Sequence, residues 1–155
     1  VGFFGADRNT TNNSFYYISC YNYGSATYRF RVADSGDVTN TNGSYGTISD
    51  RKIKTDIVDA GSQWADIKAL RFRKFKMKDD PSGLLQLGVV AQEVEETSPG
   101  LVEEHLDRDA EGNDLGTTTK SVKYSVFVPM LIKALQEQQA IIDTLTARIT
   151  ALEAK

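Results

Sequence analysis

The C-terminal stretch of this 155-residue chain, residues 130–155, repeats apolar side chains at alternating steps of four and three residues. This heptad repeat is typical of a helix that packs against other helices in a coiled coil. At 1.5 Å per residue, a helix over the stretch is about 39 Å long. So long a helix with so narrow an apolar stripe buries little against a small domain of its own chain, and we therefore predict self-association. The seam residues are Leu131, Leu135, Gln138, Ile142, Leu145, Ile149 and Leu152.

The residue types in the seam bear on the number of helices. Ile142 and Ile149 stand at a positions, and leucine fills most d positions, which by itself favours two strands. Gln138 is a polar residue at a d position, of the kind that sets the register of a coiled coil. The seam therefore predicts an oligomer without giving the number of its chains.

Amino-acid usage divides the chain near residues 46–49. Residues 1–48 contain no lysine but hold ten of the fourteen Phe and Tyr residues and six of the seven asparagines, with three basic and three acidic side chains. Residues 49–155 hold every lysine and carry the whole net charge of −3, with fifteen basic and eighteen acidic residues. Such a shift is typical of a boundary between two modules. We therefore predict two domains, residues 1–48 and residues 49–155.

The first module is predicted to consist of strands and turns. Residues 16–21 and 28–32 are rich in aromatic and β-branched residues, and the second of these stretches alternates apolar with basic side chains. A turn at 34–37 precedes a short polar strand at 38–42. Because the module has few aliphatic residues, it is not expected to build a core alone. It is expected to be the end of a longer structure, or one third of a core that is shared between chains. Two alternatives are a hairpin of an ordinary domain and a receptor- or glycan-binding tip that uses Tyr and Asn side chains.

The second module is predicted to be mixed, which makes the chain an α+β protein with a long C-terminal helix. Pro129 lacks an N–H donor and is expected in the first turn of that helix, behind a cap at Ser125. The compact apolar run at 84–90 is interpreted as a buried strand. The other expected elements are helices at 64–70 and 91–97, a strand at 71–77 and a hairpin of residues 101–106 and 117–124.

Several functional classes are disfavoured by composition. No run of about 18 apolar residues is present, so no membrane span is expected, and the first residues do not have the pattern of a secretory signal. Cys20 and His105 are the single cysteine and histidine, so neither an internal disulfide, a zinc cluster, nor any other metal or cofactor is expected. His105 is expected at the surface of an acidic loop. The mildly acidic balance also argues against nucleic acid as the partner.

Charge is unevenly distributed within the second module. Six basic residues fall within 68–78, together with Phe72 and Phe75, and nine carboxylates fall within 93–114. A basic strip with aromatic residues is one pattern of a nucleic-acid surface. The favoured interpretation is a strand with one solvated face, or a positive surface that meets the acidic segment of the same or a neighbouring chain.

The residues with the clearest chemical potential lie on the module boundary, where Lys54 follows Ser49 by five positions. A serine hydroxyl is a poor nucleophile until a base takes its proton, and a neutral lysine can be that base. With a reference pKa near 10.4, about one lysine in 2,500 is neutral at pH 7. Burial, or repulsion from Arg51 and Lys52, would have to lower that pKa. The spacing alone describes a solvated loop pair.

The motifs follow one another in a specific order: Ser49-Asp50 with Lys54, the run at 64–70, the run Gly-Val-Val-Ala-Gln-Glu-Val-Glu-Glu at 88–96, and Tyr124 leading into the heptad helix. This order resembles the C-terminal intramolecular chaperone domain of phage tail spikes and fibres, the self-cleaving peptidase S74 family. The resemblance covers residues 49–155. Residues 1–48 then resemble the end of a trimeric, β-rich tail fibre or spike.

The resemblance implies a homotrimer whose own upstream chain is the substrate. Three C-terminal helices would hold three fibre chains in register while they fold, and the chaperone would then release itself by autoproteolysis. Carried over to this sequence, the scissile bond is Ile48–Ser49, with Ser49 as the nucleophile and Lys54 as the general base. Asp50 matches the family start and is expected to orient the site. Ser49 and Lys54 are expected to be poorly aligned in the monomer and to be brought together by assembly.

Gln92 and Glu93 match the second motif of the family. They are expected to build the trimer contact, with an approach to the cleavage site as the alternative. The resemblance also implies assembly in the host cytoplasm, with the fibre part in the virion tail and the chaperone part released after cleavage. The runner-up function is a non-cleaving trimerisation module in which Ser49 is inert and the fibre keeps its cap.

Overall fold

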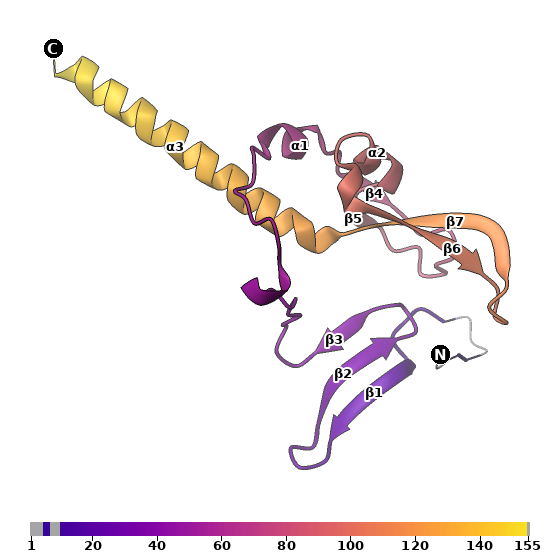
Figure 1. The fold of residues 1–155 in the computed structure, drawn as a ribbon. Coiled ribbons are helices and arrows are strands. Elements are labelled where there is room, and N and C mark those ends of the chain that lie inside the picture. The colour runs from indigo at the N-terminus through magenta and orange to yellow at the C-terminus, as the bar shows by residue number, and fades with distance from the viewer. Residues whose placement is uncertain (1–4, 7–9, 155) are drawn as a thin grey trace. The chain divides into compact units, whose positions relative to one another are not determined.

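The computed structural model describes residues 5–6 and 10–154, and the chain divides into two units. The first unit contains the described residues up to Ile57 together with Phe75–Gln86, and the second contains Val58–Lys74 and the described part of Leu87–Lys155. Strands and helices occur together, and a long helix ends the chain (Figure 1). The predicted α+β class is therefore confirmed, whereas the module boundary after residue 48 stays a prediction.

The first unit contains a three-stranded antiparallel sheet in the order β1 (Tyr16–Asn22), β2 (Thr27–Ala33) and β3 (Val38–Asn40). The strands lie where the aromatic and β-branched residues predicted them. The turn between β2 and β3 uses Gly36, whose φ of 87° suits a residue without a Cβ, and the Gly36 N–H donates to the Ala33 carbonyl at 3.1 Å. Local sequence signals are thus sufficient to place these strands.

A β-bulge changes which side chains share a face of this sheet. β2 has one extra residue at Arg29, between two positions that are paired with β1. Simple alternation would put Tyr28 and Arg31 on opposite faces, and the bulge brings them to the same face. The guanidinium carbon of Arg31 lies 3.4 Å from the ring centroid of Tyr28 and 4.7 Å from that of Tyr16. The bulge therefore creates a cation–π stack on one face of the sheet.

The sheet has almost no interior. Among the described residues up to 48, Ala33 has the only buried side chain. Larger apolar side chains remain in contact with water, as Tyr21 and Val38 do with exposed fractions of 39% and 46%. The expectation that this segment builds no core of its own is confirmed.

The second unit combines short helices and strand pairs with the start of the long helix. Helices α1 and α2 and the β6–β7 hairpin lie where the sequence predicted them. β4 and β5 pair with each other and straddle the division between the units. The elements after the 3₁₀ turn η1 (Arg51–Ile53) are α1 (Trp64–Ala69), β4 (Arg73–Phe75), β5 (Gln86–Gly88), α2 (Ala91–Glu95), η2 (Pro99–Leu101), β6 (Val102–Arg108), β7 (Asp114–Val122), η3 (Tyr124–Val126) and α3 (Phe127–Glu153).

This second unit has a hydrophobic core of its own. Val89, Val94, Leu101 and Met130 are buried against one another, and the Val94 side chain is only 1% exposed. These four residues come from separate segments, so their burial ties α2, η2 and α3 together. The partly buried apolar residues packed around them are Ile67, Leu70, Val102, Val122, Val126 and Phe127.

Two expectations about this region are wrong in detail. The run 84–90 is not a buried strand, because β5 has three residues and the Leu87 side chain is 70% exposed. An apolar run shows that a segment can be buried, but burial needs a second layer, and the described residues place none over Leu87. His105 is exposed as expected but does not lie in a loop: it lies on β6, within the strand predicted at 101–106, opposite Thr119 and with its Nε2 2.9 Å from the Ser121 Oγ.

The long helix α3 starts directly after η3. Pro129 lies in its first turn, as predicted. Ser125 does not cap the helix, because η3 runs straight into α3 and the N-cap residue, Val126, already has helical backbone angles. The start of the helix is held instead by Tyr124, whose hydroxyl accepts a hydrogen bond from the Val89 N–H at 3.0 Å.

α3 presents two different faces. Near its start, Met130 and Ala134 are buried against the rest of the second unit. The apolar residues of the predicted seam lie on another face, and their exposed fractions range from 48% to 67%. The long helix is thus confirmed, and its coiled-coil pairing stays a prediction. Within the described part of the chain, no helix has the length and apolar character needed to cross a membrane.

Candidate functional site

The predicted nucleophile and base lie in the first unit, on either side of the η1 turn. Asp50 is the N-cap residue of this turn. Its Oδ1 accepts a hydrogen bond from the Lys52 N–H at 3.0 Å, and its carbonyl accepts one from the Ile53 N–H at 3.2 Å. A carboxylate at an N-cap satisfies backbone donors that the turn itself leaves open. Asp50 therefore acts on the site by shaping the turn.

This turn brings Lys54 back to Ser49. Lys54 has an extended backbone (φ −118°, ψ 143°), and its Nζ donates a hydrogen bond to the Ser49 Oγ at 2.5 Å. Ile48, whose carbonyl carbon is the predicted point of attack, comes immediately before Ser49, and its side chain is 83% exposed. Local chain geometry alone thus brings the predicted nucleophile within proton-transfer distance of the predicted base. The expectation that the two groups are poorly aligned until assembly is therefore wrong, because the η1 turn already aligns them in the single chain.

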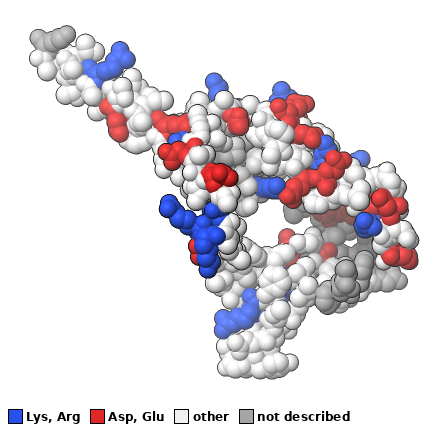
Figure 2. Space-filling view, viewed as in Figure 1, with Lys and Arg blue, Asp and Glu red and all other residues white. Residues whose placement is uncertain are grey.

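The surroundings of the pair are exposed to solvent and positively charged. Ser49 and Lys54 are exposed, as are Arg51 and Lys52, and basic side chains gather at this turn (Figure 2). Lys52 Nζ is 3.5 Å from Asp50 Oδ2, an exposed ion pair that contributes little to stability. In the hydrogen bond between Ser49 and Lys54, the lysine is the donor, whereas a general base accepts the proton of the serine. The distance between Lys54 Nζ and Ser49 Oγ suits proton transfer. The turn by itself does not exclude water from the pair.

The residues of the second motif lie on α2 in the second unit. Glu93 forms a two-pronged ion pair with Arg73, with the Arg73 Nε 3.0 Å from Oε2 and Nη2 2.6 Å from Oε1. Hydrogen bonding to Arg73 lowers the pKa of the Glu93 carboxyl, and the same bond raises the pKa of Arg73. Gln92 is exposed. Both motif residues therefore belong to a different unit from Ser49 and Lys54.

One ion pair joins the basic strip to the acidic segment, and two others join that segment to Lys120 on β7 and to Lys123 just after it. Arg73 lies in the basic strip, so its pairing with the acidic segment of the same chain confirms one of the interpretations of that strip. Glu95 Oε2 is 2.5 Å from Lys120 Nζ, and this hydrogen bond raises the pKa of that lysine. Lys123 Nζ is 2.8 Å from Glu103 Oε1 and lowers the pKa of that carboxyl. Sequence reasoning missed these partners, because the alternating charges reveal a charged face but not the side chains that the fold brings within reach.

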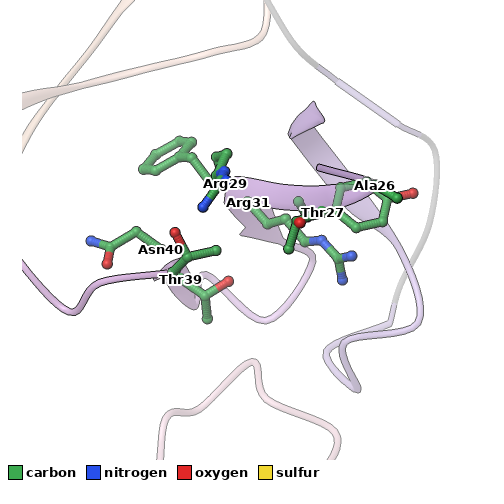
Figure 3. Close-up of a pocket in the computed structure, with 9 residues that line it drawn as sticks. Ala26, Thr27, Arg29, Arg31, Thr39 and Asn40 are labelled. Atoms are coloured by element: carbon green, nitrogen blue, oxygen red, sulfur yellow. The ribbon is translucent and has the colours of Figure 1, made fainter. Parts of the chain in front are cut away.

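A shallow hollow on the first unit is lined by side chains of β2 and β3 (Figure 3). Arg29 and Arg31 diverge from each other there, and Thr39 and Asn40 come from β3. Hydroxyl, amide and guanidinium groups of this kind could hydrogen-bond a sugar, as the glycan-binding alternative would need. Both arginines already have partners, since Arg31 stacks on two tyrosine rings and Arg29 Nη2 donates to the Ser25 Oγ at 2.9 Å. The hollow therefore carries no functional assignment.

The turn that holds Ser49 and Lys54 also begins the region of similarity to known proteins. Residues 49–103 match the family model of the chaperone of endosialidase, peptidase S74. The match runs from Ser49 through α2 to the start of β6, so the resemblance drawn from the sequence motifs is confirmed over this stretch. It supports an intramolecular chaperone role in a tail fibre or spike, and the family name indicates a self-cleaving peptidase. No curated protein matches the chain.

Proposed function

We propose that this chain trimerises and registers tail fibre or spike chains while they fold, and then releases itself by cutting the Ile48–Ser49 bond. The observation that carries the proposal is the 2.5 Å contact between Lys54 Nζ and Ser49 Oγ, at the first residue of the family match. The substrate is the upstream segment of the same chain, so each chain is cut once. The chaperone part is a serine endopeptidase with a serine–lysine dyad.

The reaction begins when the Ser49 hydroxyl gives its proton to the neutral Lys54 amine. Oγ then attacks the carbonyl carbon of Ile48 and closes a five-membered ring, because the nucleophile and the leaving nitrogen belong to the same residue. Lys54 returns the proton to that nitrogen, the amide C–N bond breaks, and an ester joins Ile48 to the Ser49 Oγ. Hydrolysis of this ester by water leaves a carboxylate on Ile48 and a free amine on Ser49.

Assembly of the subunits would exclude water from Ser49 and Lys54, which the exposed turn alone does not do. Ser49 and Lys54 are both exposed in the single chain. A covering surface from a neighbouring subunit would remove water from the pair and favour the neutral form of the amine. Cleavage would then occur only in chains that have assembled, which couples release to correct folding.

A temporary clamp also suits the N-terminal sheet, which has no core of its own. Three chains that share a core must first lose loop and association entropy, so their folding is slow. A C-terminal coiled coil raises the effective concentration of the chains for one another. Once the fibre has formed, its chains separate only by crossing a large unfolding barrier. Removal of the C-terminal chaperone part therefore leaves a kinetically trapped product. We place this assembly in the host cytoplasm, with the fibre part retained in the virion tail.

The test is to assemble the chain, denature it, and identify its fragments by gel electrophoresis and mass spectrometry. Wild type is expected to yield a fragment that begins at Ser49, whereas Ser49→Ala and Lys54→Ala are expected to stay intact. Lys52→Arg is the matched control, because this lysine lies in the same turn and the change keeps the positive charge beside Asp50. It is expected to cut as wild type does.

Each alternative has its own outcome in this experiment. Full-length wild-type chains in assembled trimers would favour the non-cleaving trimerisation module. A Ser49→Ala chain that still cuts would exclude Ser49 as the nucleophile. Efficient cutting by a monomer would contradict the dependence on assembly, which predicts concentration-dependent cleavage before the trimer forms and concentration-independent cleavage within it.

A further inference from the structure

Two hollows in the second unit lie between α1 and the predicted seam of α3. The smaller is lined by Ile67 of α1, by Leu70 and Phe72 after that helix, and by Phe127 and the seam residue Leu131 of α3. The larger, of about 540 Å³, includes two further seam residues in its lining. Its lining residues are Ser62, Trp64, Glu137, Gln138, Ile141 and Ile142.

The larger hollow is held open by a short polar connection. The Ser62 Oγ donates a hydrogen bond to the Glu137 Oε2 at 2.8 Å and accepts one from the Trp64 N–H at 3.4 Å. This connection ties the start of α1 to α3 and fixes the backbone of Trp64 beside the helix. The Trp64 side chain is nevertheless 44% exposed, and Ile141 is 60% exposed. The hollow is therefore apolar, preformed and uncovered in the single chain.

The hollow and the seam are one continuous surface. Gln138 and Ile142 belong to both, and the one charged lining residue, Glu137, already accepts a hydrogen bond from Ser62. A helix that packs along the seam necessarily reaches this edge. An exposed tryptophan in a preformed apolar hollow is the kind of residue that dominates the energy of protein interfaces.

We propose that α3 of a second copy of this chain covers the larger hollow, so that the interface between subunits includes α1 and has Trp64 as its anchor. The inference rests on the proposed trimer and adds to it a contact outside the heptad seam. Each subunit then offers a surface of two helices, α1 and α3, to the incoming helix. This surface explains how a short helix of six residues, which is too short to be stable alone, takes part in assembly.

Tryptophan fluorescence tests the inference directly, because Trp64 is the only tryptophan of the chain. The comparison is between the assembled wild type and Leu145→Asp/Ile149→Asp, a seam variant altered at two exposed positions outside the hollow. Wild type is expected to emit at shorter wavelength and to be less quenched by acrylamide than the dissociated variant. Sedimentation of the same samples reports the oligomeric state independently.

A truncation measures the energetic weight of the anchor. Trp64→Ala is expected to weaken association at least about tenfold. The control is Leu106→Ala, which removes a 55% exposed apolar side chain from β6 and is expected to leave association unchanged. Circular dichroism checks that both variants keep their helices, and the acrylamide measurement on unmodified Trp64 does not depend on this variant.

The outcomes separate this inference from the proposed function. Trimers whose tryptophan is as accessible to acrylamide as in the seam variant would overturn the role of α1 and leave the proposed chaperone intact. Unchanged association of a folded Trp64→Ala chain would overturn the anchor in the same way. A chain that sediments as a monomer at every concentration would overturn both proposals.

Discussion

The three-stranded sheet of the first unit and the second unit obtain their stability from different contacts. In the sheet, the described residues up to 48 include one buried side chain, Ala33, and Arg31 stacks on Tyr28 and Tyr16 at the surface. The second unit buries Val94 and three other apolar residues in a shared core. One region thus relies on backbone pairing and surface contacts, and the other relies on hydrophobic burial.

This difference indicates an order of folding. A sheet of three strands with a single buried side chain is marginal in water, so we expect the N-terminal region to need other chains or further segments to become stable. The second unit has a core and can fold first. Its seam residues remain exposed after that core has formed, and they are available to bring the coreless regions of several chains together.

The largest expected effect is on the cleavage of the Ile48–Ser49 bond. Lys54→Arg keeps a positive charge and a donor beside Ser49, but a guanidinium group does not lose its proton in proteins and cannot act as a base. We expect cleavage to be abolished while assembly is retained, as measured on denaturing gels of assembled material. Lys52→Arg should cut normally. Cleavage of Lys54→Arg at the wild-type rate would show that the lysine is not the base.

The next largest effect is expected when the seam is broken. Leu145→Asp/Ile149→Asp places charges in the seam and is expected to prevent assembly. Hydrogen exchange measured by mass spectrometry should then show rapid exchange throughout β1–β3, while the amides of β6 and β7 remain protected. Strong protection of β1–β3 in the monomeric variant would show that the sheet is stable by itself and does not depend on other chains.

A pair of matched truncations measures the two regions separately. Val94→Ala removes apolar atoms from a fully buried site and is expected to lower the free energy of unfolding of the second unit by about 2 kcal/mol. Val32→Ala makes the same change on the half-buried face of β2 and is expected to cost less than half as much in the monomer. Urea unfolding in the seam-variant background provides the measurement, and equal losses would contradict a coreless sheet.

The smallest expected effect is a pH dependence of the second unit. Arg73 holds the pKa of the Glu93 carboxyl below its usual range. Such a carboxylate contributes stability above its unfolded pKa, and the contribution is lost as the pH falls through the lowered value of the folded state. Urea midpoints should therefore fall in acid, and Glu93→Gln should reduce that fall slightly because the pair is partly exposed. Glu96→Gln, at an exposed site beside α2, should follow wild type.

Features that depend on neighbouring residues were predictable from the sequence. The strands of the first unit and the short helices follow from local spacing. The contact of Lys54 with Ser49 in a single chain was not predicted, although it too is local, since the Asp50 cap closes the turn within a few residues. Contacts between distant segments were not predictable. The pairing of Glu93 with Arg73 and the support of the helix start by Tyr124 depend on which segments the fold brings together.

By itself, the sequence determined that the C-terminal helix carries an apolar heptad face and that Lys54 follows Ser49 by five residues, because both are properties of spacing along the chain. Only the tertiary structure decided that Met130 faces a core while the seam remains uncovered, and that Trp64 borders that seam. The physical reason is that burial requires a second surface, and the residues that supply it are separated along the chain by many others.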